Sequence, residues 1–410
     1  MTATDTAAPT ARTVDRPQPI GLFDGPAGLL LVGDGDGVDD LLSGLAAGVV
    51  PDRWPAATAV LAAVLVNDVP GAVALLGDGT IDSVNRLVLA PNAAHLATAR
   101  RAAAGDPRLG CVVDAAAYSS GLSDEPPDPA GLDHEFSVLA LTVRAARALE
   151  FTDGRRAQLL LQEAVAPAAA TGPVLHARVL AMLAEQEGRS SARMAQAATH
   201  YGEAASLLEG TDFARLAAHF QLERGVLLHQ LADGARHHLV EAVRCYQSAL
   251  LALDRDEDPD SFALANMNLG IAILAMPMSQ ASDHVRLGVA VQSLRAALEV
   301  YGPDHHPWEW SSCQMNLANA LQYLPSTHQE DNLREAVDLY EGVLGHRSRA
   351  ADPEGYARVL ANQANALAHL GALDDAGTRY REAGALFAER GDGDAVDVID
   401  RQLAEIDGLR

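Results

Sequence analysis

A three-residue pattern that occurs six times constrains the fold of this chain more than any other feature. Each copy has an alanine, a large residue four positions later, and an alanine or valine three positions after that. Spacings of four and three place side chains on one face of an α-helix, so each copy predicts a helix. The large residues of successive copies lie 40, 45, 48, 46 and 40 positions apart. The copies are Ala157-Leu161-Ala164, Ala197-Tyr201-Ala204, Ala242-Tyr246-Ala249, Ala290-Leu294-Ala297, Ala336-Tyr340-Val343 and Ala376-Tyr380-Ala383.

A second pattern comes before the triplet in the last three complete repeats. A small residue is followed three positions later by an aliphatic residue, in the pairs Gly270/Ile273, Ala318/Leu321 and Ala364/Leu367. A proline stands 11 positions before each small residue, at Pro259, Pro307 and Pro353. Proline is tolerated in the first turn of a helix, and Asp258 and Asp352 before it can cap that turn. Each repeat is therefore expected to be a pair of helices that approach closely at the small residue.

The joint between two repeats adds a more specific resemblance. The segment Tyr301–Pro307 reads YGPDHHP and leads into Gln314–Ala318, which reads QMNLA. Together with the two helix patterns, this resembles the tetratricopeptide repeat of the kinesin-light-chain type, which bacterial scaffold and signalling proteins also contain. The chain departs from that family's pattern by one inserted histidine and by Met315 in place of an asparagine. The resemblance implies a right-handed superhelical solenoid of about six helical hairpins with a concave groove that binds a partner.

The resemblance covers residues 132–391, and the rest of the chain is divided around it. Residues 1–20 are rich in Thr, Ala and Pro and are expected to form a disordered tail. Residues 21–122 predict a mostly helical N-terminal cap region, and the proline-rich segment 123–131 predicts a linker. Residues 392–410 predict a C-terminal capping helix.

Several short segments carry their own expectations. Leu29–Val32 is a candidate strand, and the Gly33–Gly37 segment predicts a turn, because it lacks the Lys-Ser/Thr of a phosphate-binding loop and the spacing of a calcium loop. The repeats are longer than usual because of polar loops within hairpins, at Met278–Ser282 and Pro325–Gln329. Asp133 is expected to be the N-cap of the first repeat helix.

The charge balance excludes some classes of protein. The chain has 30 basic and 55 acidic residues, a net charge of −25, and no lysine. A nucleic-acid-binding protein needs a basic surface, and a polybasic membrane anchor needs the same, so neither is expected. The longest apolar run, Ala56–Val66, is too short to span a bilayer. We expect a cytoplasmic protein whose acidity provides solubility or attracts a basic partner.

No arrangement of residues predicts catalysis, a cofactor or a metal. Cys111, Cys245 and Cys313 lie far apart and match no CxxC or zinc spacing. The adjacent histidines His237-His238 and His305-His306 would point about 100° apart on a helix, which is unsuited to chelating one ion. The chain is therefore not expected to be an enzyme.

Asparagine recurs at fixed positions of the first helices and defines the candidate binding groove. Asn268, Asn316 and Asn362 stand two positions before the small residue, and Asn319 and Asn365 one position after it. An amide offers a donor and an acceptor together, which suits hydrogen bonding to the backbone of a bound peptide. Alternatively, these asparagines bridge neighbouring helices. The resemblance also places Met267, Met315, Tyr323 and His229 in the groove.

The expected function is a non-catalytic scaffold or adaptor that binds a protein or peptide partner in the groove. The first alternative is a dedicated assembly or accessory factor for an enzyme complex, for instance a metalloenzyme, which would contact its partner through the N-terminal region. The second alternative is a sensor of a small molecule or peptide.

Overall fold

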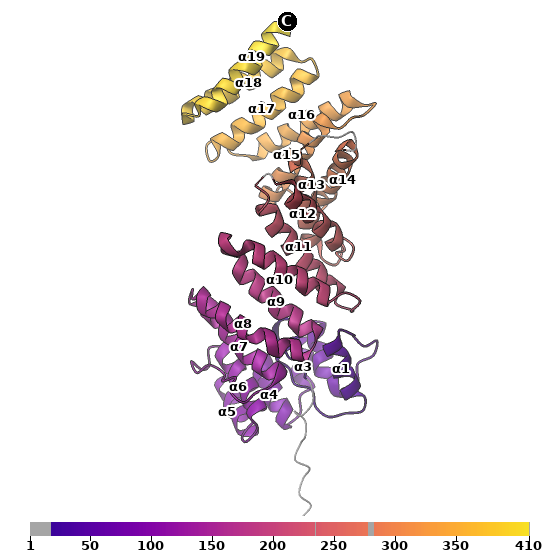
Figure 1. Cartoon of the computed structure of the whole chain (residues 1–410), viewed down its shortest axis with the longest axis vertical. Coiled ribbons are helices and arrows are strands. Elements are labelled where there is room, and N and C mark those ends of the chain that lie inside the picture. Colours follow the sequence, from indigo (N-terminus) through magenta and orange to yellow (C-terminus); the bar gives the residue numbers. More distant parts are fainter. Residues whose placement is uncertain (1–17, 234, 278–282, 410) are drawn as a thin grey trace, which may run out of the picture. The chain divides into compact units, whose positions relative to one another are not determined.

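The computed structural model describes residues 18–233, 235–277 and 283–409 (Figure 1). Residues 1–17 of the predicted tail and the predicted loop Met278–Ser282 lie outside the described residues, whereas Gln18–Ile20 are buried. In the described ranges the chain forms α-helices and three short 3₁₀-helices without a β-strand, and each helix packs on the next from α2 to α10 and from α12 to α19. The expected all-α solenoid class is confirmed. None of the helices in these ranges is both long and apolar enough to cross a membrane.

The chain divides into two compact units, residues 1–227 and 228–410. The boundary falls inside α11, Ala214–Gln230. In the first unit the other helices are α1 Val38–Ala47, α2 Ala59–Leu65, α3 Val69–Ala74, α4 Thr80–Leu89, α5 Ala93–Ala102, α6 Pro107–Ser119, α7 His134–Glu150, α8 Gly154–Thr171, α9 Pro173–Gly188 and α10 Met194–Leu207.

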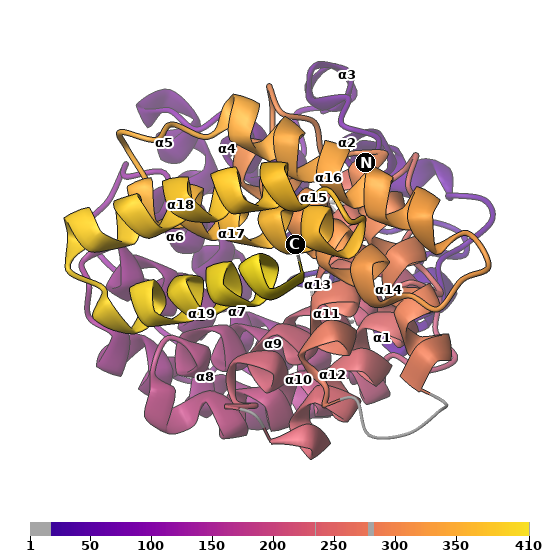
Figure 2. The same cartoon turned by 90° about the horizontal axis from the view of Figure 1, so that it is seen from above.

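The second unit is a series of helices in which each packs on the next. They are α12 Arg236–Ala249, α13 Pro259–Ala275, α14 Asp283–Leu298, α15 Pro307–Tyr323, α16 Gln329–His346, α17 Pro353–His369, α18 Leu373–Arg390 and α19 Gly393–Leu409. The contacts also join α13 to α15 and α15 to α17, so the first helices of successive hairpins lie side by side. Figure 2 shows α17, α18 and α19 next to one another.

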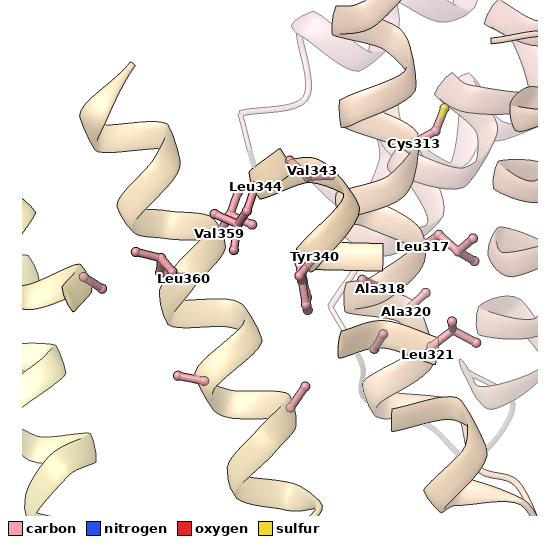
Figure 3. Packing of buried hydrophobic residues seen from close by; sticks show 14 of the residues in the cluster. Cys313, Leu317, Ala318, Ala320, Leu321, Tyr340, Val343, Leu344, Val359 and Leu360 are labelled. Atoms are coloured by element: carbon pink, nitrogen blue, oxygen red, sulfur yellow. The ribbon is translucent and has the colours of Figure 1, made fainter. Parts of the chain in front are cut away.

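The recurring triplets form the buried faces of the second helices. Every residue of the six triplets is buried, and Tyr246 and Tyr340 are fully so. Around Tyr340, the core of the second unit collects Cys313, Leu317 and Leu321 from α15, Val343 and Leu344 from α16, and Val359 and Leu360 from α17 (Figure 3). Burying an aromatic or leucine side chain contributes about 1.5–3 kcal/mol, so the triplets fix which face of each helix points inward.

The prolines and aspartates begin the first helices as predicted. Helices α13, α15 and α17 start at Pro259, Pro307 and Pro353. The Asp258 carboxylate accepts from the Ser261 N–H, and Asp352 accepts from the Gly355 N–H at 2.9 Å. Each proline therefore fills a position whose N–H has no partner within the helix, and each aspartate satisfies one of the remaining donors.

The small residue of the first helix lets the second helix approach. Gly270 of α13 faces α14, and a Cβ atom at this position would lie 2.7 Å from Cγ of Leu294 and 3.3 Å from the Ala290 carbonyl oxygen. Leu294 is fully buried and cannot swing away. Ala318 and Ala364, at the same position of the next two repeats, are fully buried as well.

The prediction of a strand at Leu29–Val32 is wrong: Leu29 ends a 3₁₀-helix, Gly25–Leu29, and the backbone groups of the residues after it bond to side chains instead of to another strand. Asn85 of α4 accepts from the Leu31 N–H at 2.9 Å and donates to the Leu31 carbonyl at 2.8 Å. The buried Gln18 accepts from the Val32 N–H. These two amides provide the hydrogen bonds that a neighbouring strand would otherwise supply.

The start of α7 departs from the expected cap. Asp133 occupies the N-cap position, but its carboxylate makes no capping hydrogen bond and lies 3.3 Å from the Arg108 guanidinium. Glu135 in the first turn is buried and accepts from the Gln18 N–H at 3.0 Å. Burial raises the pKa of this carboxyl. Glu135 therefore ties the segment at Gln18 to α7, which sequence spacing did not indicate.

Candidate functional site

Most of the predicted groove residues come from three adjoining helices of the second unit. Met267 and Asn268 lie on α13, four of the others on α15, Asn362 and Asn365 on α17, and His229 near the end of α11. The four on α15 are Met315, Asn316, Asn319 and Tyr323. Because α13 contacts α15 and α15 contacts α17, these three helices present a common surface, which we call the asparagine face.

The asparagine face has one clearly exposed aromatic side chain. Tyr323 is 61% exposed, whereas the other predicted groove residues are half-buried. Met267 and Met315 pack against the core with part of their surface. Burial lowers the pKa of His229, so its imidazole is neutral at physiological pH.

Three of the five asparagines bridge neighbouring helices. Asn362 donates to Oδ1 of Asn319 at 3.3 Å, and Asn365 donates to Oε1 of Gln322 at 2.9 Å, which links α17 to α15. Oδ1 of Asn319 also accepts from the Tyr340 hydroxyl at 2.5 Å, which adds α16 to the network. For these three asparagines, the structure therefore shows the alternative role, in which they bridge neighbouring helices.

The other described asparagine bond is local. The Asn316 amide donates to the Ser312 carbonyl one turn earlier on α15, at 2.9 Å. This bond orients the amide without tying it to another helix, and the role of Asn316 in peptide binding stays a prediction.

Gln322 and Tyr340 complete the network, and neither was predicted as a site residue. Gln322 is buried and donates to the Tyr340 hydroxyl at 2.7 Å. Burial raises the pKa of Tyr340, so the hydroxyl remains protonated and can donate. The triplet pattern predicts that Tyr340 is a packing residue. It does not predict a partner for the hydroxyl, because a bond to Gln322, 18 positions away, depends on how two helices meet.

A cleft that the sequence did not indicate lies in the first unit. Three adjoining cavities of about 280, 600 and 240 Å³ are each lined by Asp24 and Arg178. Most of the walls come from the segment Ile20–Leu29 and from α7, α9 and the first turns of α11, and the ends of α2, α3 and α6 and Tyr201 of α10 add single residues or pairs. We call this the Arg178 cleft.

The segment Ile20–Leu29 is held against α9 by two features. Gly21 has φ +72, and a Cβ atom there would lie 2.6 Å from Cδ1 of Leu175, so only glycine fits this close approach. Asp24 forms an ion pair with Arg178 of α9, whose side chain is only 18% exposed while that of Asp24 is 88% exposed. The half-buried Arg178 side chain is thus paired with a carboxylate that is mostly exposed to water.

The far end of the cleft is mixed in polarity. Tyr201 and Phe220 pack with ring centroids 6.2 Å apart beside Met182. Glu223 is exposed, but the surrounding protein partly desolvates its carboxyl group. This desolvation, followed by the negative charge of Glu185, raises the pKa of Glu223. Such a surface combines apolar contact area with a few charged groups, as binding sites commonly do.

The cysteines and histidines are groups that often take part in catalysis or metal binding. Burial raises the pKa of Cys111 and of Cys313 to about 12, so both thiols are protonated at neutral pH. His306 lies 4.0 Å from Asp260 and 5.1 Å, centre to centre, from the Tyr301 ring. Among the residues that the structure describes, no three His, Cys, Asp or Glu side chains come together in a group that could hold a metal ion.

Comparison with known proteins does not assign the chain to a family. No protein-family model matches the chain, and no curated protein is significantly similar to it. The asparagine face and the Arg178 cleft are therefore the two candidate functional surfaces.

Proposed function

We propose that this chain is a non-catalytic scaffold of tetratricopeptide-type hairpins that binds a partner protein or peptide. The observation that carries the proposal is the Arg178 cleft, because three cavities that share Asp24 and Arg178 are lined by both apolar and charged residues. A set of adjoining cavities of this kind suits a polypeptide, which makes many weak contacts. Arg178 and Glu223 would then fix its register through charged groups.

The asparagine face is the second proposed contact surface. Asn316 is held in place by its bond to Ser312, and the exposed Tyr323 lies on the same side of α15, seven positions later. Met267 and Met315 offer flexible apolar surface, which adapts to the shape of a partner. Asn319, Asn362 and Asn365 contribute by holding α15 and α17 together.

The test is affinity purification of the tagged protein from its own host, read by mass spectrometry beside matched variants. Arg178→Gln tests the cleft, and the double substitution Asn316→Ala/Asn365→Ala tests the asparagine face. Arg334→Ala on α16 serves as the control, because its side chain is exposed and pairs only within its own helix in the described structure. The proposal expects one stoichiometric partner that is retained by the control and lost by at least one test variant.

The purified partner should then bind the wild-type protein directly in calorimetry. If a test variant binds as tightly as wild type while its melting temperature is unchanged, the corresponding surface is not the binding site. If every variant retains the partner, the proposal as stated is wrong.

The volume of the largest of the three cavities in the Arg178 cleft favours a second candidate, a sensor of a small molecule or peptide. About 600 Å³ lies within the range of small-molecule pockets. A ligand that binds the folded state raises the melting temperature, and this rise should be lost in Arg178→Gln. A third possibility, an assembly factor with one dedicated partner, predicts that the partner found in the purification is a subunit of an enzyme complex bound through the first unit.

A further inference from the structure

A separate cavity in the first unit gathers arginines in a chain that is otherwise strongly acidic. It measures about 210 Å³ and lies where α6, the segment before α7, α7 and the start of α8 meet. Arg144 and Arg147 of α7 and Arg156 of α8 line it, together with the rings of Tyr118 and Phe151. The chain carries a net charge of −25, so a cavity lined by three positively charged guanidinium groups differs from the acidic character of the chain as a whole.

One of the three arginines is already neutralised. Arg147 pairs with Glu150 at 2.6 Å. Its guanidinium also lies 5.7 Å from the centre of the Tyr118 ring and 5.0 Å from that of Phe151, within the range of cation–π attraction. These contacts fix Arg147 and place both rings beside the cavity.

The charges of the other two arginines, Arg144 and Arg156, are not neutralised by a carboxylate partner within the described residues. Nε of Arg144 is buried and has no hydrogen-bond partner, which is costly for a charged group. Neither Arg144 nor Arg156 forms an ion pair within the described part of the chain. Asp153 also lines the cavity, but its Oδ1 accepts from the backbone N–H of Arg156 as the cap of α8.

We propose that this arginine cavity binds the phosphate group of a small phosphate monoester. A phosphate dianion at neutral pH would neutralise the two unpaired guanidinium groups, and the planar guanidinium matches phosphate oxygens with paired donors. The apolar part of the ester would lie against Phe151, whose side chain is 69% exposed, and Tyr118. The site is independent of the Arg178 cleft, since no residue lines both.

The probe is phenyl phosphate, titrated into the full-length protein by calorimetry, with inorganic phosphate and benzoate measured in parallel. Phenyl phosphate should bind saturably and more tightly than inorganic phosphate, which lacks the ring, and than benzoate, which carries a single charge. Arg144→Gln and Arg156→Gln should each weaken binding about tenfold or more, as expected for the loss of a charged hydrogen bond.

Arg155→Gln is the matched control, because this neighbouring arginine is exposed and does not line the cavity. It should leave the affinity unchanged, and all variants should melt as wild type does. An equal loss in Arg155→Gln would show diffuse electrostatic attraction and overturn the proposal, as would the absence of saturable binding at millimolar concentrations. Equal affinity for inorganic phosphate would overturn the assignment to an ester, and equal affinity for benzoate would overturn the assignment to a dianion.

Discussion

Adding a methyl group at Gly270 tests how the helical hairpins are packed. In Gly270→Ala the new Cβ would lie 2.7 Å from Cγ and 3.0 Å from Cδ2 of Leu294. Gly288→Ala on α14 is the matched control, because it also lies inside a helix but its Cβ would meet no atom within 4 Å. The two substitutions are chemically identical and differ only in whether a second helix is in contact.

The magnitudes follow from two opposing effects. Alanine is about 1 kcal/mol more favourable than glycine inside a helix, and both variants gain this amount. Overpacking a well-filled core costs about 1–3 kcal/mol, and only Gly270→Ala incurs this cost, since Leu294 is fully buried. We therefore expect Gly288→Ala to raise the free energy of unfolding by up to ~1 kcal/mol and Gly270→Ala to leave it unchanged or lower it by up to ~2 kcal/mol.

Urea unfolding followed by tryptophan fluorescence is the suitable assay. Two of the three tryptophans, Trp308 and Trp310, lie in the same unit as Gly270, so the signal reports mainly on that unit. The midpoint should rise for Gly288→Ala and should stay unchanged or fall for Gly270→Ala, with the slope unchanged for both. If Gly270→Ala stabilises the protein as much as Gly288→Ala does, the close approach of α13 and α14 is not as described.

Two further predictions concern buried polar groups. Tyr340→Phe removes the hydroxyl that joins Gln322 to Asn319 and should destabilise the protein by about 1–3 kcal/mol in the same assay, whereas Tyr323→Phe at an exposed site should have almost no effect. For Glu135, burial raises the pKa of the folded state above that of the unfolded state, so its contribution to stability falls as pH rises through the interval between the two. Glu135→Gln should therefore gain stability relative to wild type as the pH rises above the ordinary pKa of glutamate, and a difference that does not change with pH would contradict the assigned burial.

The helices and their inward faces could be predicted from the sequence because both depend on local spacing. The triplet around Tyr340 predicts a buried face, and Pro353 with Asp352 predicts a helix start, since each involves residues within one or two turns of one another. The same spacing does not tell which side chains of two helices meet. Gln322 was missed for this reason, although it lies on the same helix as the predicted Asn319.

The candidate site was harder to predict than the fold. Asp24 and Arg178 are 154 positions apart, and no periodic pattern connects them. Gly21 allows the segment Ile20–Leu29, which is not part of a repeat, to approach α9. This approach depends on one residue, so no recurring pattern in the sequence could predict it. The asparagine positions were recognised from their recurrence, but recurrence alone did not distinguish a side chain that bridges helices from one that is free to bind a peptide.

The hydrogen bonds of Asn85 have a consequence for solubility. The segment Leu30–Val32 is apolar and non-helical, and such a segment can pair with an identical segment of another chain if its backbone is free. Asn85 occupies both backbone groups of Leu31, and Gln18 occupies the N–H of Val32. The two amides thereby satisfy, inside the folded unit, the backbone groups that intermolecular β-pairing would need.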